Sequence, residues 1–208
     1  ISVPNNPLEV FQLSAVCDDT NLVSATNLTF GVIGTNYSLL VLPATNMFGT
    51  NIITVCATDS FGLTTVPSFV LGVQSVNDYP SFIVPVGDQV ISEDTTVTVF
   101  FEIGDVETAD TNLVIGGRSY NQSVQQDNVL GFGGSGRQRY IILHPVRNQH
   151  GTALMEIRVR DEAGVRSTNL FTLTVVPVED RPSISFIDDV TVSEDAPLTV
   201  SFTVSDVE

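Results

Sequence analysis

The sequence predicts an all-β protein built from tandem antiparallel β-sandwich domains, and three observations lead to this prediction. The first is an internal repeat, because residues 43–50 (PATNMFGT) return as residues 145–152 (PVRNQHGT), 102 residues later. The second is an alternation of apolar and polar residues with a period of two, which is typical of half-buried strands. The third is the punctuation of the chain by 15 Gly and 10 Pro, which favours turns over long helices.

The repeat sets the expected domain boundaries. A period near one hundred residues is a whole domain, since solenoid repeats run to roughly 20–50 residues. We therefore expect a first sandwich repeat over 1–78 whose opening strand is missing or degenerate, a complete repeat over 79–180, and the first strands of a third over 181–208. Past the linker the register slips by one residue, so that residues 92–94 (SED) fall on residues 193–195 (SED). The chain is expected to be an excerpt from a longer array.

The expected strands follow from the positions of the apolar residues. The alternation covers residues 97–103, 155–159, 171–175 and 198–204. Residues 131–136 (GFGGSG) match the glycine pattern of a phosphate-binding loop, but a strand pattern follows them instead of a helix, so a hairpin loop is expected there. About seven short strands in about one hundred residues is the content of an immunoglobulin-like sandwich.

Composition argues against several classes of function. The chain contains 24 Asp and Glu against 8 basic residues, all of them Arg, and its net charge is −16. Such a charge repels phosphate backbones, so nucleic acid is not expected as a partner. No apolar run approaches the roughly 20 residues of a membrane helix, so no membrane span is expected. The only histidines, His144 and His150, stand over Leu42 and Phe48 of the other repeat, and no catalytic role or enzyme activity is expected.

Several motifs resemble those of a known family. Residues 55–62 (VCATDSFG) and 76–82 (VNDYPSF) resemble the penultimate strand and the calcium linker of cadherin repeats, and residues 105–112 (DVETADTN) look like the acidic loop of that family. The Ser-Glu-Asp and Pro-x-x-Asn-x-x-Gly-Thr signatures are similar to cadherin-like and bacterial immunoglobulin-like repeats of large surface proteins and adhesins. The resemblance implies a non-catalytic extracellular repeat with calcium as a candidate ligand of its junctions.

The acidic residues give this expectation a geometric form. If the strands alternate in direction, each junction collects carboxylates from the end of one domain, the linker and the start of the next. Ca²⁺ requires six to eight oxygen ligands, and such a junction could supply them. The candidate ligands are Asn77, Asp78, Glu93, Asp94, Asp105, Glu107, Asp110, Asp161, Glu179, Asp180, Asp206 and Glu208. Asn5 and Asn6 are read as the first-repeat counterparts of Glu93 and Asp94. The alternative interpretation is that these acids are solvated polar caps of the sandwiches.

Two further sets of residues suggest covalent modification. Cys17 lies on an apolar strand face, where immunoglobulin domains place their first bridging Cys, and Cys56 lies in the partner strand, which predicts a Cys17–Cys56 disulfide in an exterior protein. The strand alternation around Asp59 points Cys56 outward, so this pairing needs a bulge. Acceptor triplets for N-glycosylation begin at Asn27, Asn36 and Asn121, unless they arise by chance in Asn-rich and Ser-rich loops.

The sequence therefore favours a structural module of a long extracellular or cell-surface fibre or stalk. Its expected partners are neighbouring repeats or copies of the same protein, arranged head to tail, and residues 181–208 are expected to become ordered only through such a neighbour or through further chain. The alternative is an adhesin repeat that binds carbohydrate or a partner protein. Its surface would lie between Gly116 and Gly136, and an exposed aromatic cluster of Tyr120, Phe132 and Tyr140 would favour it.

Overall fold

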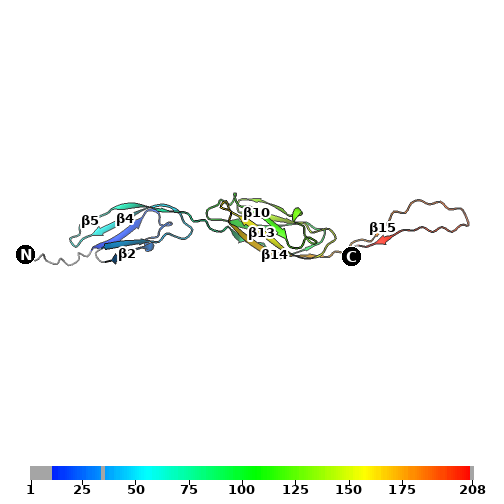
Figure 1. The fold of residues 1–208 in the computed structure, drawn as a ribbon, viewed down its shortest axis with the longest axis horizontal. Helices are drawn as coiled ribbons and strands as arrows, with labels where there is room; N and C mark the ends of the chain where they lie inside the picture. The colour runs from blue at the N-terminus through cyan, green and yellow to red at the C-terminus, as the bar shows by residue number, and fades with distance from the viewer. Residues whose placement is uncertain (1–10, 34–35, 207–208) are drawn as a thin grey trace, which may run out of the picture. The chain divides into compact units, whose positions relative to one another are not determined.

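The computed structural model describes residues 11–33 and 36–206, and divides into two compact units, Ile1–Asn77 and Asp78–Glu208 (Figure 1). Strands make up 49% of the structure and helix 3%. This confirms the prediction of an all-β protein with antiparallel sheets. No helix in the described ranges has the length and apolar character needed to cross a bilayer.

The second unit contains a sandwich of two four-stranded sheets. Its strands are β7 (Ser81–Val84), β8 (Gln89–Ser92), β9 (Val97–Gly104), β10 (Val114–Ser119), β11 (Gly131–Ser135), β12 (Gln138–Leu143), β13 (Gly151–Arg160) and β14 (Arg166–Val176), with a 3-10 turn η2 (Asp127–Val129). One sheet has the order β10-β13-β14-β8 and the other the order β11-β12-β9-β7. The pairing of β8 with β14 is parallel, and the other pairings in both sheets are antiparallel.

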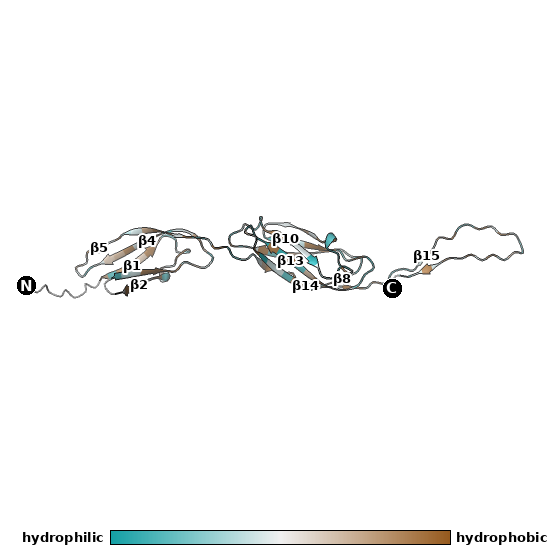
Figure 2. Ribbon diagram, viewed as in Figure 1, coloured by the Kyte–Doolittle hydropathy of each residue, from teal (hydrophilic) through white to brown (hydrophobic). Residues whose placement is uncertain are grey.

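The core of the second unit lies between these two sheets. Phe101 and Ile141 come from one sheet, and Met155, Ile157 and Leu173 come from the other, and each is at most 1% exposed. These residues alternate along their strands with polar or exposed ones, because successive side chains of a strand point to opposite faces. Figure 2 shows apolar residues mainly on the strands of both units.

The first unit repeats the later part of this fold. Its strands are β1 (Gln12–Cys17), β2 (Leu28–Ile33), β3 (Asn36–Val41), β4 (Gly49–Thr58), β5 (Thr64–Thr65) and β6 (Ser68–Val73), with a 3-10 turn η1 (Ala25–Asn27). A shift of 102 residues places β1 on β10, β4 on β13 and β6 within β14. Left-handed backbone conformations recur at the same shift, with φ of 59° at Asn46 and 54° at Asn148, and of 82° at Gly62 and 90° at Gly164. The described strands of the first unit are thus counterparts of β10 to β14.

The first unit buries fewer apolar side chains than the second. Its fully buried apolar residues among those described are Leu22, Val23 and Ile53. In it, β4 pairs with β1, β5 and β6, while β2 and β3 form a separate two-stranded sheet. Leu71 is only half-buried, whereas Leu173, its counterpart 102 residues later, is 0% exposed. The described strands of the first unit therefore enclose a less complete core.

The C-terminal segment forms a short hairpin of its own. β15 (Ser183–Ile184) pairs with β16 (Val204–Ser205), and every described residue from 181 to 206 is exposed. Of residues 198–204, for which a strand is expected, only Val204 lies in a strand here, β16. The physical reason is that alternating apolar residues gain stability in a strand only when a sheet and a facing layer cover them. The expectation that this segment joins the sheets of a third repeat stays a prediction.

Candidate functional site at the acidic ends of the second unit

One acidic end of the second unit is built around the loop that follows β9. The carboxylate oxygen Oδ1 of Asp105 accepts the backbone N–H groups of Glu107, at 3.0 Å, and of Thr108, at 2.7 Å. Its other oxygen, Oδ2, is buried and has no hydrogen-bond partner in the described structure. Glu107 in turn accepts the backbone N–H of Asp78 through Oε2 at 2.9 Å. These contacts hold the entry of the chain against the loop.

The turn between β13 and β14 lies at the same end. Asp161 is 3% exposed, and its Oδ1 accepts the backbone N–H of Val165 at 2.6 Å. The hydroxyl oxygen of Thr108 accepts the backbone N–H of Glu162 at 3.4 Å. This hydrogen bond places the Asp105 loop and the Asp161 turn side by side. Both aspartates use a side-chain oxygen to close their own turn, as Asp does in many loops.

Two arginines that the sequence patterns did not indicate also reach this end of the unit. Nε of Arg137 lies 3.5 Å from Oδ2 of Asp110. Arg139 is 5% exposed and donates to the backbone carbonyls of Asp110, at 2.7 Å, and Leu113, at 3.4 Å. Arginine therefore offsets part of the negative charge here. Since all eight basic residues lie between 118 and 181, their clustering was the signal that could have indicated such pairing.

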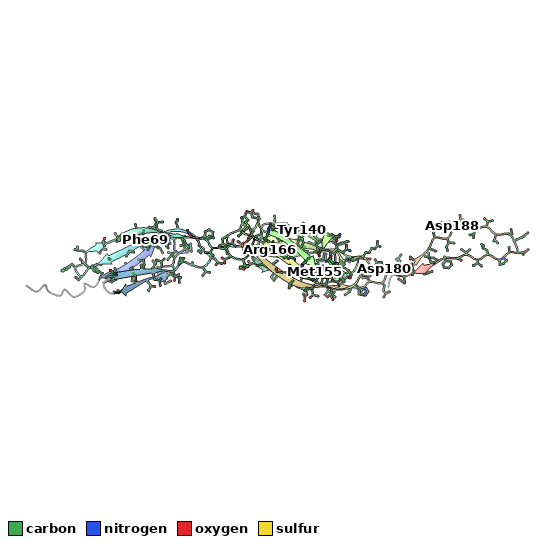
Figure 3. The ribbon with its side chains drawn as sticks, viewed as in Figure 1. Phe69, Tyr140, Met155, Arg166, Asp180 and Asp188 are labelled. Carbon is green, nitrogen blue, oxygen red and sulfur yellow. The ribbon has the colours of Figure 1, made fainter. Side chains whose placement is uncertain are left out.

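Acidic side chains hold the chain at the other end of the unit as well. Glu93 is 4% exposed, and its Oε1 accepts the backbone N–H of Val178 at 2.7 Å. Asp94 has φ of 56° and accepts the backbone N–H of Asn148 at 3.0 Å. Glu179 is exposed, and Asp180, which Figure 3 labels, is half-buried. Glu93 thus fixes the exit of the chain after β14.

The structure brings some of the candidate metal ligands together, but it does not assemble them into a site. In residues 11–33 and 36–206, no group of three or more His, Cys, Asp or Glu side chains is arranged to hold a metal ion. Glu93, Asp94, Asp105, Glu107 and Asp161 each accept a backbone N–H instead. Of the remaining candidates, Asp206 is exposed, Asn77 belongs to the first unit, and Glu208 lies outside the described residues.

Asn5 and Asn6, which were read as the first-repeat counterparts of Glu93 and Asp94, lie outside the described residues. That correspondence stays a prediction.

The predicted Cys17–Cys56 disulfide is wrong, because both cysteines are free. Cys17 stands opposite Ile53 on the inner face of the β1–β4 pair, and its thiol donates to a backbone carbonyl. Cys56 stands opposite Ser14 on the outer face, three positions along the register. Thiols on opposite faces of one sheet cannot meet. The error arose because β1 is the counterpart of β10 and pairs directly with β4.

The acceptor triplets for glycosylation differ in their surroundings. The amide nitrogen of Asn27 donates to the carbonyl of Leu42 at 3.1 Å, and that of Asn121 donates to the carbonyl of Thr152 at 2.8 Å. Asn36 is exposed at the start of β3. Since a glycan would attach to the amide nitrogen, Asn36 is the best placed of the three.

Tyr120, Phe132 and Tyr140 do not form the exposed aromatic cluster that would favour an adhesin. Tyr120 is 52% exposed beside the outer face of the β10–β13 pair, with the guanidinium of Arg118 4.4 Å from its ring centre. Phe132 packs against the core. Tyr140 (labelled in Figure 3) lies on β12 of the other sheet. Its ring meets that of Phe100 edge to face, at 5.9 Å between ring centres.

No protein-family model and no curated protein sequence matches the chain. The structure of protocadherin gammaB7 EC3-6 in a cis-dimer is 18% identical with a TM-score of 0.51, and covers 87% of this chain and 43% of its own. The EC1-2 structure of human mucin-like protocadherin is 18% identical with a TM-score of 0.50, and covers 81% of this chain and 85% of its own. The fold is cadherin-like. At these identities the likeness shows the fold alone, and it agrees with the β-sandwich topology of the second unit.

Proposed function

We propose that the chain is a structural tandem-repeat module of a long extracellular or cell-surface fibre or stalk, and that it works without catalysis. The observation that carries the proposal is the internal repeat, which aligns strands, turns and left-handed residues at one shift of 102 residues. A chain that repeats a whole domain in register extends its length by adding domains, which is the property that a spacer or fibre requires. The cadherin-like fold supports an extracellular setting.

The ends of the second unit support a role under tension. Its entry is held by Glu107, which accepts the N–H of Asp78, and its exit by Glu93, which accepts the N–H of Val178. Hydrogen bonds to a charged group contribute about 1.5–3 kcal/mol each. A pull on the two ends of this unit therefore meets a charge-assisted hydrogen bond at each end before it reaches the sheets.

Single-molecule stretching of residues 1–208 tests this proposal. The second repeat should unfold in one event that lengthens the chain by about 300 Å, since roughly 100 residues extend at most about 3.3–3.6 Å each. The Glu93→Ala variant should lower the unfolding force of this event only, and Glu179→Ala, which removes an exposed acid next to the exit, should leave it unchanged. Gradual lengthening without a discrete event would contradict the proposal of a mechanically independent module.

We also propose that calcium binds at the acidic end that contains Asp105. The supporting observation is the buried Oδ2 of Asp105, because a carboxylate oxygen without a hydrogen bond can accept a cation. The residues that would hold the ion are Asp78, Asp105, Glu107, Asp110 and Asp161. Their present fit is incomplete, since the described residues form no group of three metal ligands and Asp110 is paired with Arg137.

The test is small-angle scattering and thermal unfolding of residues 1–208 in Ca²⁺ and in EGTA. Calcium should raise the unfolding temperature and increase the maximum dimension, and Asp105→Asn should remove both effects. If neither quantity changes, the acids act only as turn-forming and charged surface groups, and the calcium proposal fails while the repeat-module proposal stands.

One observation favours the second candidate function, an adhesin repeat that binds carbohydrate. A hollow of about 260 Å³ is lined by Val84, Phe100, Phe101, Glu102 and Gln138. Phe100 is 71% exposed in it, and an exposed ring beside a carboxylate and an amide is the combination that binds a sugar ring and its hydroxyls. Phe100→Ala should abolish binding to a glycan panel if this function holds, and an absence of any binding by the native chain would reject it.

A further inference from the structure

Half of the basic residues of this acidic chain lie on one surface. The outer face of β10, β13 and β14 carries Arg118, Arg158, Arg160 and Arg166, which we call the arginine face (Figure 3 labels Arg166). The register settles their common orientation. Arg158 and Arg160 alternate along β13 with the buried Met155, Ile157 and Val159. Arg118 stands opposite Glu156, which lies on that same outer face, and Arg166 stands opposite Arg160. The chain as a whole has a net charge of −16, so this concentration of positive charge is a local feature.

The fold does not require these arginines. The first unit has the same strands 102 residues earlier, and the four equivalent positions hold Val16, Cys56, Thr58 and Thr64. A sheet with identical pairing therefore forms with neutral residues on this face. The arginines are a property of the second repeat. Their role should therefore be sought in something other than the stability of the fold.

The charge of the face is only partly neutralised. Arg118 lies 3.1 Å from Glu156, which is 6% exposed and also accepts hydrogen bonds from Arg158 and Tyr120. Burial would raise the pKa of Glu156, but the hydrogen bonds from Tyr120, Arg158 and Arg118 outweigh it and hold that pKa below its ordinary value. Glu156 is thus ionised and balances one of the two arginines that share it.

The other two arginines face each other. Arg160 and Arg166 are direct partners in the β13–β14 register, and both are exposed. Neither forms an ion pair within the ranges that the structure describes. Like charges directly opposite on adjacent strands destabilise a sheet, and an external carboxylate placed between them would relieve this repulsion.

The neighbours of the arginines on the same face are apolar. Val114, Tyr120, Leu154 and Leu170 are between 45% and 53% exposed. Arginine and tyrosine mixed with aliphatic side chains is the composition of protein interfaces, where Arg and aromatic residues are enriched and Lys and Glu are depleted. This mixture favours a protein as the partner over a polysaccharide.

We propose that the arginine face docks side-on against the acidic first unit of a second copy of this chain. Residues 1–77 contain four acids and no Lys, Arg or His, so this unit is complementary in charge. The outer face of its β1, β4 and β6 strands exposes Val16, Ile52 and Val70 by 44–70%, with the exposed Asp18 at one end. At physiological salt, repulsion between the two acidic chains is screened beyond about 8 Å, whereas contacting pairs are screened much less.

The size of the face sets the expected strength. Three strands about 4.8 Å apart and up to eleven residues long cover roughly 14 Å by 36 Å, which is below the 800 Å² per partner of a standard interface. A single pair of chains should therefore associate weakly and reversibly. Repetition of such contacts along an array would strengthen the association without any new contact.

Sedimentation velocity of the whole chain over a concentration series tests the proposal. The native chain should show reversible self-association that is lost in the triple variant R118V/R160T/R166T, in which each arginine takes the residue of the first unit. Arg158 is kept as the partner of Glu156, because a buried carboxylate without a partner would destabilise the fold. The matched control R137Q/R147Q/R181Q removes the same number of charges away from the face and should associate like the native chain. Thermal unfolding of each variant checks that the fold is intact.

A mixing experiment tests which surface is the partner. The chain has no Lys, so an amine-reactive dye labels the N-terminus alone. Labelled triple variant should still sediment faster when native chain is added, because its acidic first unit remains available to the arginine face of the native copy. The proposal is overturned if the native chain stays monomeric, if the control also fails to associate, or if the variant fails to bind the native chain. A further outcome is that the native chain binds heparin without self-associating, and that only the triple variant loses that binding. This result would assign the face to an anionic polysaccharide and would also overturn the proposal.

Discussion

The two repeats place leucine at the same structural position, which allows a matched test of how much each core contributes. Leu71 of β6 and Leu173 of β14 are 102 residues apart and pair with Asn51 and Ala153 of their neighbouring strands. Leu173 is 0% exposed, while Leu71 is half-buried. The same change, leucine to alanine, therefore removes the same atoms from two environments that differ in burial.

The expected losses follow from that difference. Leu173→Ala removes a fully buried side chain between two four-stranded sheets that cannot easily close the gap, so the free energy of unfolding of the second unit should fall by about 3–5 kcal/mol. Leu71→Ala loses only part of the burial energy of a leucine, and water can enter the space, so about 1 kcal/mol is expected for the first unit. At about 4–8 °C per kcal/mol, the first change should lower the melting temperature of its unit by roughly 12–40 °C.

Differential scanning calorimetry of the whole chain measures both effects. We expect two transitions, with Leu173→Ala shifting only that of the second unit and Leu71→Ala shifting only that of the first. Equal shifts for the two variants would refute the reasoning from burial, and a single transition that moves in both variants would refute the independence of the two units.

Three further outcomes are expected. Glu156 has a pKa below its ordinary value of 4.5 in the folded chain, so it stabilises the second unit above about pH 4.5 and loses this contribution as the pH falls through the folded pKa. In denaturant titrations at several pH values, the free energy of unfolding of Glu156→Gln should therefore fall less steeply toward acid pH than that of the native chain. An equally steep fall in both would contradict the shift. Glu93→Ala should lower the free energy of unfolding of the second unit, measured in urea, by about 1.5–3 kcal/mol, because a backbone N–H loses its charged acceptor. Glu179→Ala should change that free energy by no more than about 0.5 kcal/mol. Equal losses in the two variants would contradict the contact between Glu93 and the exit of the chain. Mass spectrometry after alkylation under denaturing, non-reducing conditions should find Cys17 and Cys56 both alkylated, and an unmodified pair would restore the disulfide.

Much of the fold was predictable because its signal is local. Alternation at 97–103, 155–159 and 171–175 gave strands whose apolar residues do line the core of the second unit. The parallel pairing of β8 with β14 was not predictable in this way, because alternation identifies a strand and its buried face but not its neighbour. Residues 198–204 show the converse limit, since their alternation is clear and yet most of them form no strand without a covering sheet.

The candidate site was predictable in position but not in chemistry. Strand direction accounts for the meeting of the Asp105 loop with the Asp161 turn at one end of the unit. It could not show that the carboxylates of Asp105, Glu107 and Glu93 accept backbone N–H groups, because these hydrogen bonds depend on side-chain rotamers and on turns closed by distant residues. The pairing of Asp110 with Arg137 was hidden for the same reason.

The error in the predicted Cys17–Cys56 disulfide could have been avoided from the repeat. The shift of 102 residues, extended to the start of the chain, places residues 12–17 on 114–119 and so makes β1 the counterpart of β10. That register puts Cys17 and Cys56 in paired strands of one sheet, on opposite faces, where a disulfide cannot form. The repeat was thus more informative than the analogy with the strand order of immunoglobulin domains.

Immunogold electron microscopy of the native source, with an antibody raised against residues 79–180, tests the central proposal most directly. A structural repeat of an extracellular fibre or stalk predicts label outside the cell membrane, along elongated structures. An antibody against residues 1–77 should label the same structures. Label on compact particles inside the cell, or on isolated particles without an elongated structure, would contradict the account.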